Sequence, residues 1–133
     1  MQTRIKRILK ENAHVLLLWN EMLDDSEMAK EYISTLQRYK VKTTNAIANF
    51  DPDEEKLNFF GQEFTKLVYD NWHSVTEEGF IGGAVSLSYT PSKTHPSYEN
   101  FIKALSTIFS KYQRDGEVLF HYHTEICICQ FAE

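Results

Sequence analysis

The stretch EVLFHYHTEICICQF, Glu117–Phe131, predicts a long β-strand, because side chains of two kinds alternate along it. It holds both cysteines and two of the five histidines of the chain. Even positions such as Val118 and Phe120 are mostly apolar, and we expect them to face the core along the whole strand. The odd positions carry groups with chemistry: His121, His123, Glu125, Cys127 and Cys129. The stretch therefore predicts a two-faced strand on which the preceding elements pack.

The odd face of this strand contains candidate metal ligands, because imidazole and thiolate groups bind zinc and other transition metals. The candidates are His121, His123, Cys127 and Cys129. On a straight strand, however, the first and last of them would lie roughly 26 Å apart at ~3.3 Å per residue. No turn residue interrupts the stretch to fold it back. A half-covered sheet face is therefore the simpler interpretation, no cofactor is predicted, and metal or small-ligand binding is the alternative.

The remainder of the chain shows mainly helical spacing of apolar residues, which predicts an α+β fold. We expect three N-terminal helices, a strand over 84–90, a fourth helix that begins near Pro96, and the long C-terminal strand. The first helix would run from Thr3 to Leu23. The second would follow the capping box at Asp24–Glu27, and the third would run from Asp51 to about Gly79.

The two predicted strands, 84–90 and 117–131, would pair antiparallel into a small sheet packed on helices. A two-stranded sheet alone is marginally stable, so we expect a third strand or a partner's strand to complete it. The edge of the C-terminal strand is therefore the predicted interface of a homodimer. A chain of 133 residues without linker-like or repeated segments predicts one domain, residues 1–133.

Composition constrains the partners and the compartment. The net charge of −5 disfavours nucleic-acid binding and favours a protein partner with a basic surface. Asp51, Asp53, Glu54 and Glu55 are the candidate binding residues, although acids at a helix start are also explained by the helix dipole. The apolar run Val15–Trp19 is too short to cross a bilayer, so no membrane association is predicted. With no sign of structural disulfides, we expect a soluble, cytoplasmic protein.

These observations favour a small acidic protein-binding domain, of the inhibitor or immunity type that neutralises a basic enzyme or toxin. The alternative is the metal- or small-ligand-binding domain described above. An enzyme that uses Asp70, His73 or His95 as acid or base has the least support, because no nucleophile motif accompanies these residues. We therefore predict no catalytic residue.

Overall fold

The computed structural model describes residues 2–41, 52–61 and 63–130. Five helices and three strands occur in these ranges, in the order α1 Gln2–Lys6, β1 His14–Met22, α2 Glu27–Arg38, α3 Pro52–Phe60, β2 Thr65–Thr76, α4 Glu77–Val85, α5 Tyr98–Tyr112 and β3 Glu117–Gln130. The chain divides into two compact units. Unit 1 consists of Met1–Glu21, Ile47–Asp70 and His123–Glu133, and unit 2 of Met22–Ala46 and Asn71–Tyr122. One domain over residues 1–133 stays a prediction.

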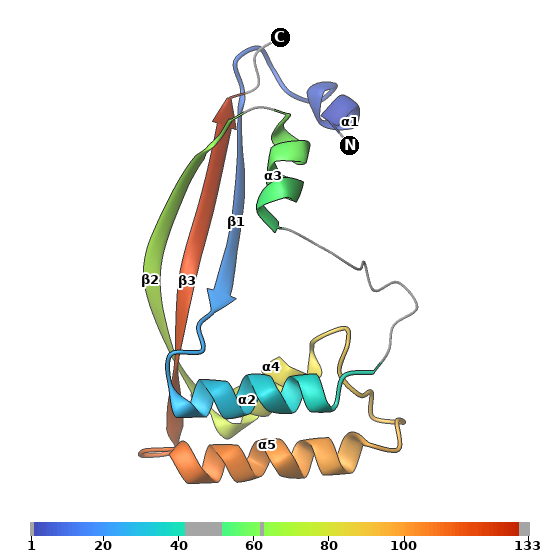
Figure 1. Cartoon of the computed structure of the whole chain (residues 1–133), viewed down its shortest axis with the longest axis vertical. Helices are drawn as coiled ribbons and strands as arrows, with labels where there is room; N and C mark the ends of the chain where they lie inside the picture. Colours follow the sequence, from blue (N-terminus) through green and yellow to red (C-terminus); the bar gives the residue numbers. More distant parts are fainter. Residues whose placement is uncertain (1, 42–51, 62, 131–133) are drawn as a thin grey trace. The chain divides into compact units, whose positions relative to one another are not determined.

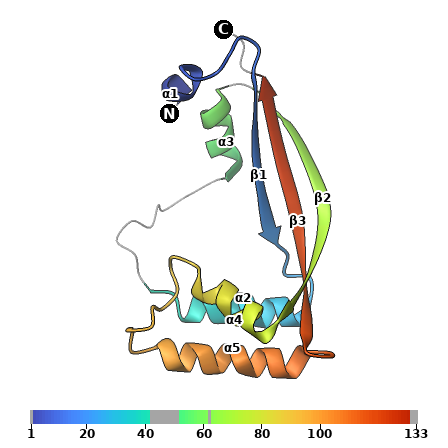
Figure 2. The ribbon, with the colours of Figure 1, turned by 180° about the vertical axis from the view of Figure 1, so that it is seen from behind.

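The strands form one antiparallel sheet in the order β1-β3-β2 (Figures 1 and 2). The α+β class and the antiparallel sheet packed on helices are confirmed. The predicted strand order is wrong, because β3 pairs with β1 and β2 instead of with residues 84–90. β3 is therefore the central strand and has a neighbour at each edge. A partner's strand could add only to β1 or β2, so the predicted dimer edge on β3 is wrong, and homodimerisation itself stays a prediction.

β1 replaces most of the first predicted helix. Its side chains alternate in burial from His14 to Asn20, and the half-buried ones are Val15, Leu17 and Trp19. An unbroken apolar run satisfies the spacing of a helix and of a strand equally well. Here every second residue is half-buried on the sheet, so the segment forms a strand. Only Gln2–Lys6 of the predicted helix is helical, as α1.

The third predicted helix is likewise divided into α3 and β2. Gly61 follows the last residue of α3 and adopts a positive φ of 67°, a conformation that glycine enters without the steric cost borne by other residues. Its amide donates to the carbonyl of Leu57 over 2.7 Å, which closes the last turn. Beyond it, the β-branched and aromatic residues of Thr65–Thr76 form a strand. The apolar residues before and after Gly61 happen to keep helical spacing, and the sequence therefore predicted one continuous helix.

α4 occupies the place where a helix end and the strand over 84–90 were predicted. Thr76 caps it, since its side chain accepts a hydrogen bond from the amide of Gly79 over 3.5 Å, and Glu77 lies in its first turn. Phe80 and Ala84, four residues apart, are its buried side chains. Burial of this helical face therefore determines the structure, and the alternating pattern that predicted a strand over 84–90 does not. By contrast, α5 and β3 lie where the sequence predicted a helix and a strand.

The core of unit 2 is formed by α2, α4 and α5 with the first half of β3 (Figure 1). The rings of Phe80 and Phe120 stack with centroids 5.5 Å apart, and Tyr32 lies 4.8 Å from Phe80. Tight ring packing of this kind stabilises beyond the burial of area. The α2 helix begins at Ser26, whose hydroxyl accepts from the amide of Ala29 over 3.1 Å. The predicted second-helix residues after Val41 lie outside the described ranges.

The core of unit 1 is smaller and uses the other parity of β3. Cys127 and Cys129 are buried there with Phe60 of α3 and half-buried side chains of β1. In unit 2, by contrast, the even positions Val118 and Phe120 are buried. The prediction that even positions face the core along the whole strand is therefore right for unit 2 and wrong for unit 1. None of the helices in the described ranges has the length and apolar character that crossing a membrane requires.

Truncating Leu105 of α5, which is fully buried, should destabilise unit 2 strongly. We expect Leu105→Ala to lower the free energy of unfolding by about 2–5 kcal/mol, from lost apolar contact and the cavity left behind. Urea denaturation followed by circular dichroism measures this value. Leu119→Ala is the matched control, because Leu119 in the same unit is 52% exposed and should cost less than about 0.5 kcal/mol. Equal losses in both variants would contradict the described core.

Candidate functional site

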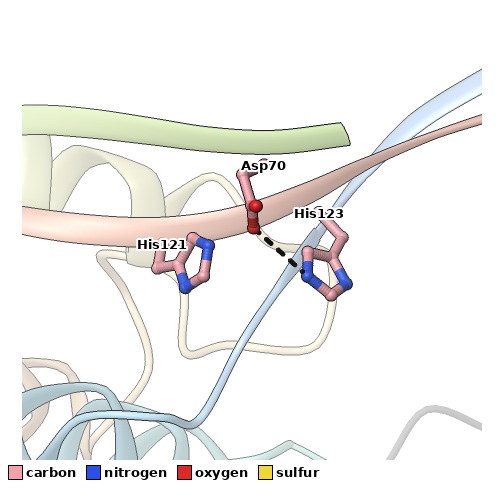
Figure 3. A group of neighbouring side chains, drawn as sticks. All are labelled: Asp70, His121 and His123. Carbon is pink, nitrogen blue, oxygen red and sulfur yellow. Dashed lines mark ion pairs between the residues drawn. The ribbon is translucent and has the colours of Figure 1, made fainter. Parts of the chain in front are cut away.

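In unit 1, neighbouring strands bring His123 of β3 against Asp70 of β2. The His123 Nε2 atom lies 3.5 Å from the Asp70 Oδ1 atom, and both side chains are open to solvent (Figure 3). This separation is longer than an ordinary hydrogen bond between nitrogen and oxygen. The two groups therefore form a loose ion pair when His123 is protonated.

In unit 2, His121 contacts Asp25 and Trp72. Its Nδ1 atom lies 2.5 Å from Asp25 Oδ2, and its ring stacks on Trp72 with centroids 3.8 Å apart and planes 2° apart. The amide of Leu23 donates to the His121 carbonyl over 2.9 Å, which places Asp25 beside the histidine just before the α2 cap. The Asp25 carboxylate fixes the direction in which the Nδ1 edge of the His121 ring points, and the Trp72 indole fixes the plane of that ring.

The Asp25 contact engages the Nδ1 atom of His121. Because an ionised carboxylate can only accept, the Nδ1 atom donates its hydrogen to Asp25. Carboxylates hold metal-binding histidines in this way. In unit 1, Asp70 and His123 are the pair of candidate ligand groups that neighbouring strands bring together. Sequence reasoning named both histidines, but neither Asp70 as the companion of His123 nor Asp25.

The two cysteines of the predicted ligand set lie elsewhere in unit 1. Cys127 is fully buried and Cys129 nearly so, both against Phe60. The Cys129 Sγ atom lies 3.8 Å from the carbonyl oxygen of Glu63. Neither cysteine is bonded in a disulfide. Their environment is that of small apolar core residues.

The other residues singled out in the sequence are scattered. Glu54 and Glu55 are exposed on α3, whereas Asp51 and the Asp53 side chain lie outside the described part of the chain. On β2, Asp70 and His73 are three residues apart, so they belong to opposite sides of the strand rather than to neighbouring helical turns. His95 caps a local turn, where its Nδ1 accepts from the amide of Ser97 over 3.1 Å.

A buried ion pair anchors α3 in unit 1. Lys56 of α3 donates to Glu125 Oε1 over 2.6 Å, and the two side chains are 10% and 6% exposed. Lys66 of β2 approaches the same oxygen to 3.3 Å, and the Lys56 ammonium lies 4.3 Å above the Trp19 ring. Burial alone would raise the pKa of Glu125, but hydrogen bonds from both lysines outweigh it and lower the pKa.

The opposite side of the unit 1 sheet carries exposed apolar side chains. Leu16 and Leu18 of β1 are 58% and 65% exposed, and they alternate with the residues that face α3. Thr124 of β3 donates to Asn20 over 2.6 Å on this side. By strand alternation, the same side includes Leu67 and Tyr69 of β2, both exposed. We name the four side chains Leu16, Leu18, Leu67 and Tyr69 the open face.

Neither a scan of protein-family models nor a search of curated proteins finds a match to this sequence. The assignment of function therefore depends on the residues themselves.

Replacing the buried carboxylate of Glu125 should destabilise unit 1 by leaving Lys56 charged and buried. We expect Glu125→Gln to cost about 3–5 kcal/mol at pH 7. Because the folded pKa lies below the ordinary value of 4.5, the ionic stabilisation is present above pH 4.5 and is lost as pH falls through the folded value. Urea denaturation of wild type and variant between pH 3 and pH 8 tests both points.

The difference in stability between the two proteins should be constant at neutral pH and should shrink below about pH 4.5. Lys66→Met is the control for the pair, because the Lys66 side chain is 39% exposed. It should change stability by no more than about 1 kcal/mol. A stability difference for Glu125→Gln that persists unchanged at pH 3 would show that ionisation is not its source.

Proposed function

We propose that this protein is an acidic protein-binding domain and that unit 1 contacts the partner through the open face. The observation that carries the proposal is the exposure of Leu16, Leu18, Leu67 and Tyr69 on one side of the sheet. Single exposed leucines are ordinary, but several exposed apolar side chains on one side of a sheet mark interaction surfaces. The mixture of three leucines and a tyrosine suits a contact with an apolar centre.

The edges of the sheet support the same proposal. β1 and β2 are the outer strands, and every side chain from Thr65 to Asp70 of β2 is exposed. Proteins commonly protect such edges with charge, proline or a covering segment. Lys66 and Asp70 supply charge on one side of β2, whereas Leu67 and Tyr69 on the other side remain apolar. A partner that covers the open face would remove this apolar surface from water.

Neutralisation of a basic enzyme or toxin is the form of binding that the net charge of −5 favours. Glu54 and Glu55 on α3 are exposed acids of unit 1, but α3 packs on the side of the sheet opposite the open face. In this proposal the open face supplies affinity, and the acids accelerate the approach of a basic partner. The two contributions are separable by experiment.

Replacing the leucines of the open face with lysine should abolish partner binding. Protein carrying a benzophenone amino acid at Leu18 would be irradiated in lysate of the source cells, and crosslinked proteins identified by mass spectrometry. A stoichiometric partner should be competed by wild type. The double variant Leu16→Lys, Leu18→Lys should compete at least tenfold more weakly, since each buried leucine contributes about 1.5 kcal/mol. The control is the same benzophenone amino acid placed at Leu119, which is exposed in unit 2 and should not crosslink this partner. Equal competition by the double variant would refute the open face as the contact.

Neutralising the acids of α3 tests whether the captured partner is basic. For Glu54→Gln, Glu55→Gln we expect a slower association rate, a weaker dependence of that rate on salt, and a dissociation rate close to that of wild type. Stopped-flow or surface-plasmon measurements at two salt concentrations supply these rates. Glu99→Gln on α5, also exposed, is the control and should leave the rates unchanged. An unchanged salt dependence in the double variant would exclude these acids from the encounter.

A further inference from the structure

We propose that unit 2 binds a small apolar α-amino acid, in its zwitterionic form, in a pocket beside the turn that joins α5 to β3. The pocket has a volume of about 470 Å³, and all of its lining residues belong to unit 2. Its lining combines the buried apolar residues Met28 and Val118 with the exposed charged residues Arg114 and Glu117. An apolar wall with a few polar groups that orient the ligand is typical of small-molecule sites.

The turn between α5 and β3 places the two charged residues opposite each other (Figure 1). Its central residues, Asp115 and Gly116, have positive φ angles of 53° and 80°, as a type I′ hairpin turn requires. The Arg114 amide donates to the Glu117 carbonyl over 2.9 Å, and the Glu117 amide donates to the Arg114 carbonyl over 3.1 Å. Residues paired in this way project their side chains from the same side of the hairpin.

Although these two residues are neighbours, their charges do not pair with each other. Glu117 is engaged by β2, because the Ser74 hydroxyl donates to its Oε2 atom over 2.8 Å. Within the part of the chain that the structure describes, the Arg114 side chain has no ion-pair partner. The pocket therefore presents a positive and a negative group, side by side but separate, next to an apolar wall. Such an arrangement is complementary to a ligand that carries both charges.

An apolar α-amino acid matches each of these features. Its carboxylate would accept hydrogen bonds from the guanidinium of Arg114, whose planar fork suits a bidentate contact. Its ammonium would donate to the Glu117 carboxylate, which can accept further hydrogen bonds beside the one from Ser74. Its side chain would lose contact with water against Met28 and Val118, which belong to the core of unit 2. A ligand with a single charge would satisfy only one of the two charged residues.

Titration of the full chain with L-phenylalanine or L-leucine, followed by nuclear magnetic resonance, tests the proposal. The amide signals of Met28 and of residues 114–119 should shift and saturate, with a dissociation constant of about 1 mM or lower. Three analogues of phenylalanine each lack one feature: 3-phenylpropionate the ammonium, phenethylamine the carboxylate, and glycine the apolar side chain. Each should bind at least about fivefold more weakly than phenylalanine.

Two results would overturn the proposal. One is the absence of saturable binding of both amino acids up to about 10 mM. The other is binding of 3-phenylpropionate or phenethylamine as tight as that of phenylalanine, because the pocket would then not recognise a zwitterion.

Two variants assign the two ends of the ligand to their partners. Arg114→Gln should weaken phenylalanine binding at least about fivefold and leave phenethylamine binding unchanged, since phenethylamine has no carboxylate. Glu117→Gln should weaken phenylalanine binding by a similar factor and leave 3-phenylpropionate binding unchanged. Lys103→Gln and Glu99→Gln are the matched controls, because they remove exposed charges on α5, and they should bind as wild type. Wild-type affinity for phenylalanine in both pocket variants would refute the site.

Circular dichroism and urea denaturation verify that each variant folds. The analogues probe the same contacts in the wild-type chain, so they decide the question even where a variant does not fold. The amino-acid site of unit 2 and the open face of unit 1 consist of different side chains. The double variant Leu16→Lys, Leu18→Lys should therefore bind phenylalanine as wild type does, so that failure of the site and failure of partner binding are distinguishable.

Discussion

The central position of β3 is the constraint on which the remaining structure depends. A central strand must satisfy hydrogen bonds at both edges, and β1 and β2 supply them. The strand is 14 residues long, longer than one small core can cover. Each half is therefore buried by a different unit, Val118 and Phe120 in unit 2 and Cys127 and Cys129 in unit 1. The buried positions of β3 are therefore even in unit 2 and odd in unit 1.

The two cores differ in how they are stabilised. Unit 2 relies on ring packing around Phe80 and on the long helix α5, whose burial needs no polar partner. Among its described residues, unit 1 has three buried members in its apolar cluster, and its short helix α3 is additionally fixed by Lys56 and Glu125. A buried ion pair is poor compensation for a small core, since desolvation offsets much of its attraction. It does, however, specify where α3 lies on the sheet.

The sequence predicts an element of this fold correctly where caps and a single apolar period mark that element. α2 and α5 have caps and one apolar stripe, and Glu117–Gln130 alternates without a break, so these elements were predictable. β1 was not, because Val15–Trp19 is apolar at every position and fits both periods. Gly61 was the overlooked signal at the end of α3, and Thr76 that at the start of α4. The histidines were predictable from the strand, whereas Asp70 was not, because it was assigned to a helix.

The same misassignment explains why the sequence paired Asp70 with the wrong histidine. In a helix, Asp70 would sit one turn from His73 and suggest an acid–base pair; on a strand, the two point to opposite sides. Placing residues 65–76 in β2 separates that pair and brings Asp70 to His123, which lies 53 positions further along the chain. Pairing between distant strands is the step that sequence periodicity does not contain. The contact between Asp70 and His123 is therefore a product of sheet topology, whereas the recurrence of histidine at positions 121 and 123 is a product of local strand spacing.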